Sequence, residues 1–186
     1  MAASPPRVGV IGLGNVLMGD DAFGPWVIQT LLSEYEFPDD VSVEDLGTPG
    51  LDLMPYVIDL EALVLVDTVR SAAAPGTVRL YRRDELLKNP PGPRLGPHDP
   101  GVQEALLAGE LAGRGPREVL LVGTAPVRAA MGGGLSHALR EAVPRAVAEV
   151  LRELERLGRP ATRRPEPRSP DVWWEDEPAA RGHAPP

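Results

Sequence analysis

Residues 8–24 read VGVIGLGNVLMGDDAFG. The apolar run Arg7–Gly12 ends in glycines, a pattern that predicts a buried strand followed by a sharp turn. Helical spacing follows, because apolar residues recur on one face of Val27–Tyr35, and Pro25 is tolerated in a first helical turn. The stretch therefore predicts a strand, a turn and a helix in succession.

The glycines of this turn raise the alternative of a dinucleotide-binding loop. Such a loop needs glycine at its first, third and sixth positions, and an acidic residue about 20 residues further on. Gly12 and Gly14 fill the first and third positions, but Leu17 fills the sixth, and Asp45 comes too late in the chain. These departures argue against a dinucleotide-dependent oxidoreductase.

The rest of the chain alternates strands and helices. The clearest buried strand is Leu63–Asp67, LVLVD, and further strands are expected at Val41–Leu46, Thr77–Tyr81 and Glu118–Gly123. Helices are expected at Leu51–Ile58, at Gly101–Leu111 and from a Ser136 cap to Leu157, with Gly158 as the stop. This order predicts a three-layer α/β/α sandwich around a mostly parallel sheet of about five strands.

Composition limits the remaining possibilities. The chain has 186 residues, 42% of them hydrophobic, which suits one domain at residues 1–158. No cysteine is present, which excludes disulfides and thiolate nucleophiles, and the net charge of −8 argues against nucleic acid. No signal sequence or membrane span is evident, so we expect a cytoplasmic protein without membrane contact. The tail 159–186 is rich in proline and arginine and is expected to be disordered, with Trp173 and Trp174 as an alternative docking motif.

Polar residues follow the predicted strand ends, where ligands bind in open sheets of this type. They are Asn15, Asp20 and Asp21 after the first strand, Asp45 and Thr48 after the second, Asp67 after the third, and His98 in a later loop. Carboxylates and an imidazole that meet in one crevice suit nickel, zinc, iron or manganese.

Four of these residues also have a simpler interpretation. Asp21 is placed to cap the following helix, Asp67 to form an ion pair with Arg70, and His98 to be solvated in its loop. Thr48 is a candidate cap for the helix at Leu51–Ile58. The spacing of the residues leaves these alternatives open.

Six motifs, taken in order, resemble the hydrogenase maturation proteases. They are GLGNVLMGDDAFG at 12–24, DLGTPG at 45–50, LVLVDTV at 63–69, GPHDPG at 96–101, VGTAP at 122–126 and GLS at 134–136. These proteases are endopeptidases that remove a C-terminal extension from the large subunit of nickel-iron hydrogenases. The resemblance spans residues 7–157, with departures at Ala22, Thr124 and Ala125.

The resemblance implies roles for particular residues. The family's catalytic, metal-contacting acidic residues fall on Asp21 and Asp67, and its histidine falls on His98. Its partner-recognition segment falls on Gly47 and Thr48, with Asp45 just before, and Asn15 joins these as a substrate-binding residue.

The implied metal is nickel carried by the substrate, and the implied partner is the hydrogenase large-subunit precursor, met by a monomeric protease. The resemblance leaves open whether nickel drives hydrolysis or whether a carboxylate such as Asp67 acts as general base. A non-proteolytic, nickel-sensing chaperone for the large subunit is the alternative function.

Overall fold

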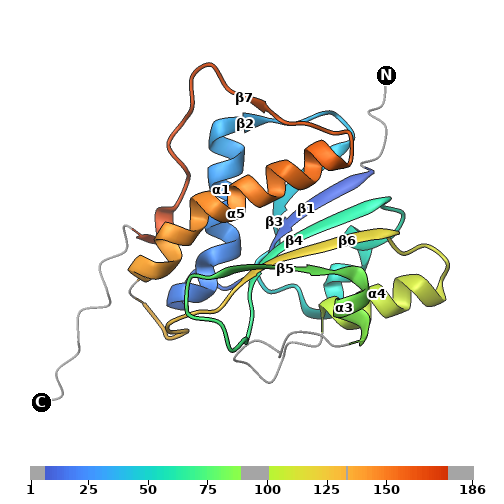
Figure 1. The fold of residues 1–186 in the computed structure, drawn as a ribbon, viewed down its shortest axis with the longest axis horizontal. Helices are drawn as coiled ribbons and strands as arrows, with labels where there is room; N and C mark the ends of the chain where they lie inside the picture. The colour runs from blue at the N-terminus through green and yellow to red at the C-terminus, as the bar shows by residue number, and fades with distance from the viewer. Residues whose placement is uncertain (1–6, 89–100, 133, 176–186) are drawn as a thin grey trace, which may run out of the picture.

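The computed structural model describes residues 7–88, 101–132 and 134–175. Its central sheet has five strands in the order β3, β1, β4, β6, β5 (Figure 1). These strands are β1 (Val8–Gly12), β3 (Val41–Asp45), β4 (Ala62–Thr68), β5 (Val78–Arg82) and β6 (Glu118–Thr124). Neighbouring strands are parallel except at the edge, where β5 runs antiparallel to β6. The mostly parallel sheet of about five strands is confirmed.

Helices cover both faces of this sheet. One layer holds α1 (Phe23–Glu34) and α5 (His137–Arg156), and the other holds α2 (Met54–Val57), α3 (Arg83–Lys88) and α4 (Val102–Leu111) (Figure 1). Along β4, Val64 and Val66 pack in the first core, whereas Leu63 and Leu65 pack in the second. The apolar run is unbroken because both faces of β4 are buried. The three-layer architecture is thereby confirmed.

The start of α1 lies unusually close to the carboxyl ends of two strands. A Cβ added at Gly24 would lie 2.2 Å from the Leu13 carbonyl oxygen and 2.5 Å from that of Val66. Only glycine allows this approach, because any side chain would overlap backbone atoms. The close contact places the loop between β1 and α1 directly over the end of β4.

Several local expectations need correction. The segment expected as one helix at Leu51–Ile58 is split into the 3-10 helix η2 (Gly50–Leu53) and α2. The hydroxyl of Ser136 makes no capping hydrogen bond, although α5 does begin at the next residue. Gly158 has a φ of 72° just after α5, which fits its predicted role as the stop. The short helix α3 was not predicted.

The expected disorder does not hold for residues 159–175, which form a C-terminal strap over the α1 and α5 layer (Figure 1). The strap contains β7 (Thr162–Arg163), which pairs antiparallel with β2 (Tyr35–Glu36), and ends in the 3-10 helix η3 (Trp173–Glu175). Trp174 is 7% exposed and belongs to the core of that layer, whereas Trp173 is 54% exposed. The buried Trp174 ring supplies apolar contact area that holds the strap in place, which the proline-rich composition of the segment did not indicate.

Among the described helices, none combines the length and the apolar character that crossing a membrane would require.

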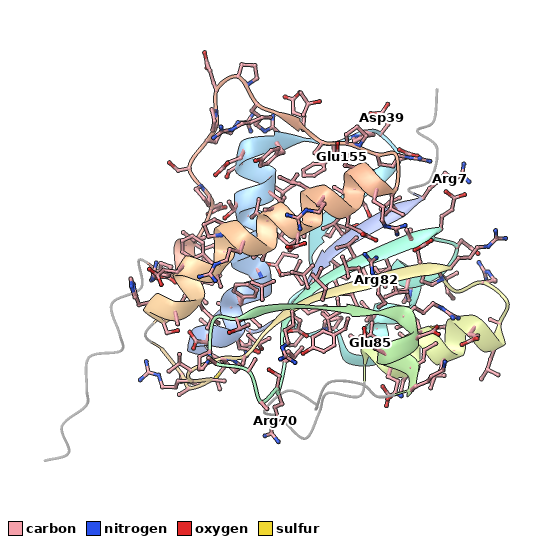
Figure 2. All side chains as sticks on the ribbon, viewed as in Figure 1. Arg7, Asp39, Arg70, Arg82, Glu85 and Glu155 are labelled. Carbon is pink, nitrogen blue, oxygen red and sulfur yellow. The ribbon has the colours of Figure 1, made fainter. Side chains whose placement is uncertain are left out.

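A buried charge cluster joins α5 to the edge of the sheet. The Glu153 carboxylate is 5% exposed and accepts hydrogen bonds from Arg82, at 2.6 and 3.0 Å, and from Arg156, at 2.7 and 3.0 Å. Figure 2 shows Arg82 at the end of β5 that leads into α3. Burial alone raises the pKa of Glu153, but the hydrogen bonds and charges of Arg156 and Arg82 outweigh it and lower the pKa to about 2.

We expect Trp174→Ala to lower the free energy of unfolding by about 3 kcal/mol, because it removes a large buried side chain and leaves a cavity. Trp173→Ala, the adjacent control, should lower it by less than about 1 kcal/mol because that ring is mostly in solvent. Urea denaturation followed by circular dichroism measures both. Equal losses in the two variants would mean that the strap does not depend on the buried ring.

The Glu153 cluster should make stability depend on pH. The folded-state pKa of about 2 lies below the ordinary value of 4.5, so the contribution is complete above about pH 4.5 and is lost as the pH falls through about 2. The stability difference between the wild type and Glu153→Gln should therefore be larger at pH 7 than at pH 3, measured by urea denaturation. Glu155→Gln, on the exposed face of the same helix (Figure 2), is the matched control.

Candidate active site

Asp21 is held at the carboxyl end of the central strand by two hydrogen bonds. Its Oδ2 atom accepts the backbone N–H of Asn15 at 2.8 Å, and its Oδ1 atom accepts the Thr68 hydroxyl at 3.0 Å. The first position of α1 is capped by no side chain, so the alternative that Asp21 caps this helix is wrong. Thr68 follows Asp67 directly in β4, and the contact therefore brings the loop after β1 to the end of that strand.

Asp67 lies where the sequence placed it, near the end of β4, and it is 5% exposed. It pairs in register with Gly123 of β6, one strand further from β1. Because adjacent strand residues point to opposite faces, Asp67 lies on the face covered by α2, α3 and α4, and Thr68 on the other. Asp21 and Asp67 thus approach the end of β4 from two sides of the strand.

Sequence reasoning gave Thr68 no role. The only local signal is a hydroxyl next to an acidic residue at a strand end, and that signal does not identify the partner. The hydrogen bond to Asp21 joins residues that lie 47 positions apart in the chain.

The turn after β3 lies beside the turn after β1. The Gly47 N–H donates to the Asp45 carboxylate at 3.0 Å, and the Gly14 N–H donates to the Gly47 carbonyl at 2.8 Å. Gly47 has a φ of 59°, which favours glycine. Burial raises the pKa of Asp45, and the Gly47 N–H offsets part of that rise.

Of the expected substrate-binding residues, Asn15 and Thr48 are exposed, on neighbouring turns. The Asn15 side chain accepts the Leu17 N–H at 3.0 Å, which fixes the shape of its turn. Thr48 lies two residues before η2, which begins at Gly50. The structure therefore brings the Asn15 turn and the 45–48 turn together at the carboxyl ends of β1 and β3.

Asp20 has a structural role that the sequence did not show. Its carboxylate is 1% exposed and accepts the backbone N–H groups of Val127 at 2.7 Å, Arg128 at 3.0 Å and Ser136 at 2.6 Å. These donors belong to the loop between β6 and α5. The carboxylate thus joins the loops that follow two different strands of the sheet.

His98 lies outside the described residues, so the predicted trio of Asp21, Asp67 and His98 stays a prediction. Within residues 7–88, 101–132 and 134–175, no three His, Cys, Asp or Glu side chains are grouped so as to hold a metal ion. The structure therefore describes two of the three expected members and the contacts that position Asp21.

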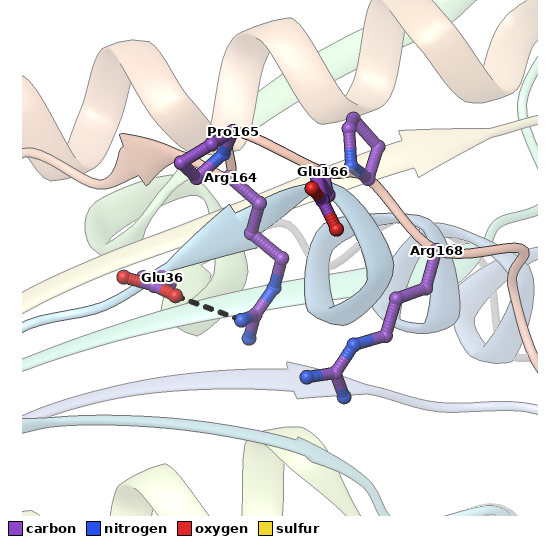
Figure 3. Close-up of a pocket in the computed structure, with 6 residues that line it drawn as sticks. Glu36, Arg164, Pro165, Glu166 and Arg168 are labelled. Carbon is purple, nitrogen blue, oxygen red and sulfur yellow. Dashed lines mark hydrogen bonds and ion pairs between the residues drawn. The ribbon is translucent and has the colours of Figure 1, made fainter.

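A pocket of about 430 Å³ lies between Glu36 and strap residues 164–168 (Figure 3). Arg164 contacts Glu36 at 2.9 Å, and Arg168 and Glu166 also line the pocket. It lies at the far end of α1 from Asp21, and a 12-residue helix is roughly 18 Å long. This pocket is therefore separate from the candidate active site.

The two neighbouring aspartates should respond differently to substitution. We expect Asp20→Asn to lower the free energy of unfolding by about 2 kcal/mol, because an amide group would turn a donor towards buried backbone N–H groups. Asp21→Asn, the matched control, should lower it by less than about 1 kcal/mol, because Asp21 is only partly buried. Urea denaturation at pH 7 distinguishes them, and a larger loss in Asp21→Asn would contradict this division of roles.

Comparison with known proteins points to one family. A family model described as hydrogenase maturation protease matches residues 25–153. The matched range includes Asp45, Asp67 and His98 but begins after Asp21. The chain is 35% identical to the hydrogenase expression/formation protein HupM of Azotobacter chroococcum mcd 1. The match extends over 165 residues and covers 88% of this chain and 79% of HupM.

A sequence and a solved structure from Escherichia coli are also similar. The hydrogenase 2 maturation protease of strain K12 is 31% identical over 156 residues, covering 82% of this chain and 93% of its own. The solved structure of the hydrogenase maturating endopeptidase HybD superposes with a TM-score of 0.78 at 31% identity, covering 85% of this chain and 98% of that one. The chain therefore belongs to the hydrogenase maturation protease family and is an endopeptidase.

Proposed function

We propose that this endopeptidase removes the C-terminal extension of a [NiFe]-hydrogenase large-subunit precursor once nickel has been inserted into that subunit. The observation that carries the proposal is the position of Asp21, which Asn15 and Thr68 hold at the end of β4, the strand that also carries the buried Asp67. Membership of the family supports the same conclusion.

Asp21 is oriented and still able to bind a cation. A carboxylate offers about four lone-pair sites, and the two hydrogen bonds occupy one site on each oxygen. The remaining sites are available to a metal ion that the substrate brings. In this proposal Asp21, Asp67 and His98 contact that nickel and hold the scissile peptide beside it, because carboxylate and imidazole ligands suit nickel.

The nickel of the loaded substrate would polarise the scissile carbonyl and make water more acidic, which is the chemistry that a bound divalent metal supplies. Asp67 is the alternative general base, since it lies at the same strand end. Cleavage would then depend on the metal load of the precursor, so that an empty precursor is left intact.

The two turns that follow the carboxyl ends of β1 and β3 would recognise the precursor. Asn15 and Thr48 are exposed there, and the hydrogen bond between Gly14 and Gly47 keeps their turns adjacent. Asp45 shapes the second turn through its bond to the Gly47 N–H. Contacts at these turns would place the precursor next to Asp21.

The test is the intact mass of a nickel-loaded large-subunit precursor after incubation with the wild type, Asp21→Ala or Asp67→Ala. The wild type should release a short C-terminal peptide, and both variants should be slower by about 10² or more, because each loses a metal-contacting carboxylate. Asp39→Ala removes an exposed carboxylate at the amino end of β3, away from the strand ends that carry Asp21 and Asp67 (Figure 2). This variant should cleave the precursor at the wild-type rate.

A nickel-free precursor serves as the second control and should stay uncut. Cleavage of that precursor at the same rate would overturn the dependence on nickel. Normal rates in both Asp21→Ala and Asp67→Ala would remove these carboxylates from the mechanism. A stable complex of the wild type with the loaded precursor and no change in mass would favour the chaperone function.

A further inference from the structure

Three large apolar side chains are exposed on the loop that carries Asp21 and on the loop after β6, which hydrogen-bonds to the adjacent Asp20. Leu17, in the loop after β1, is 48% exposed, and Val127 and Met131, in the loop after β6, are 57% and 83% exposed. We call these three residues the apolar rim. Leu17 lies only four residues before Asp21, so the rim adjoins the candidate active site.

The two loops of the rim form one connected surface. The Gly132 N–H donates to the Leu17 carbonyl at 2.9 Å, and the Asp20 N–H donates to the Arg128 carbonyl at 3.1 Å. The backbone comes close at Gly19, whose φ is 58° and where an added Cβ would lie 3.2 Å from the Ala130 carbonyl. Leu17 and Met131 are therefore held in neighbouring positions by hydrogen bonds between their loops.

The far end of the second loop is held from two directions. The Asp20 carboxylate accepts the Ser136 N–H at 2.6 Å, and Glu175 of the strap accepts the N–H of the preceding Leu135 at 3.2 Å. Glu175 is itself held by the Trp26 indole N–H at 2.9 Å and by an ion pair with Arg140. The rim is thus ordered before any partner binds, which reduces the entropy that binding must overcome.

We propose that the apolar rim is a docking surface for the hydrogenase large-subunit precursor, an inference that rests on the proposed function. The loop that carries Leu17 also carries Asp21, so the rim is continuous with the proposed substrate site. The exposed Met131 and the exposed Arg128 on the loop after β6 are of the residue types that are enriched at protein interfaces. The net charge of −8 disfavours a polyanionic occupant.

The chain offers a matched control for the rim. Leu111 is 91% exposed, more than any rim residue, and it lies at the end of α4 that leads towards the start of β6. The rim follows the carboxyl ends of β1 and β6, whereas Leu111 lies towards the amino ends of the strands. A polar substitution there changes surface hydrophobicity without touching the rim.

The experiment compares the wild type with the double variant Leu17→Gln, Met131→Gln and with Leu111→Gln, all acting on the nickel-loaded precursor. The double variant should raise KM about tenfold or more with kcat within about twofold, because docking residues contribute to binding and not to the chemical step. Leu111→Gln should match the wild type. Each variant is checked by thermal unfolding, and Val127→Gln provides a second rim variant if the double variant unfolds.

A binding measurement separates this inference from the proposed function. In an Asp67→Ala background, calorimetry should show a Kd for the loaded precursor that rises about tenfold with the rim substitutions. An unchanged Kd and KM, or an equal rise in Leu111→Gln, would overturn the docking surface even if the wild type cleaves the precursor. Rim-dependent binding without cleavage by the wild type would overturn the proposed function and leave the docking surface standing. A wild-type dimer in sedimentation that the rim variant abolishes would assign the rim to a second copy of the chain instead.

Discussion

The buried carboxylate of Asp20 holds together the two loops that border the candidate active site. A charge that is 1% exposed is unfavourable unless hydrogen bonds satisfy it, and three backbone N–H groups from the loop after β6 do so. If the loops after β1 and β6 separated, this charge would lose its partners while still buried. The two loops therefore behave as one unit, although Asp20 and its nearest donor in sequence lie 107 positions apart.

Asp20 and Asp21 are adjacent in sequence and have different environments. Asp20 is buried and accepts three backbone N–H groups of the described residues, whereas Asp21 is partly exposed and accepts the Thr68 hydroxyl at the end of β4. The short 3-10 helix η1 (Gly19–Ala22) sets this divergence, and Gly24 permits it by letting α1 approach the strand ends. Asp20 joins two loops beside the candidate active site, and Asp21 is partly exposed at that site.

The C-terminal strap provides a second contact to the loop after β6. Leu135 and Ser136 are consecutive, and their N–H groups are accepted by Glu175 and Asp20 respectively. Trp174 anchors the strap in the core that also contains residues of α1, α5 and the sheet, and it directly precedes Glu175. A segment with the composition of a disordered tail therefore helps to fix the loop that borders the candidate active site.

The sequence by itself determined the layers, the sheet and the position of Asp67 at a strand end, because apolar periodicity and unbroken aliphatic runs are local properties of the chain. Motif order was enough to indicate the family. The contact of Asp21 with Thr68, the role of Asp20 and the burial of Trp174 were decided only by the tertiary structure. The Asp21 contact joins residues 47 positions apart, and the Asp20 contacts join residues 107 or more positions apart. The burial of Trp174 depends on the core into which the fold brings it. Local patterns carry no information about such pairings, since the same aspartate can cap a helix, bind a cation or accept backbone N–H groups according to what the fold brings to it.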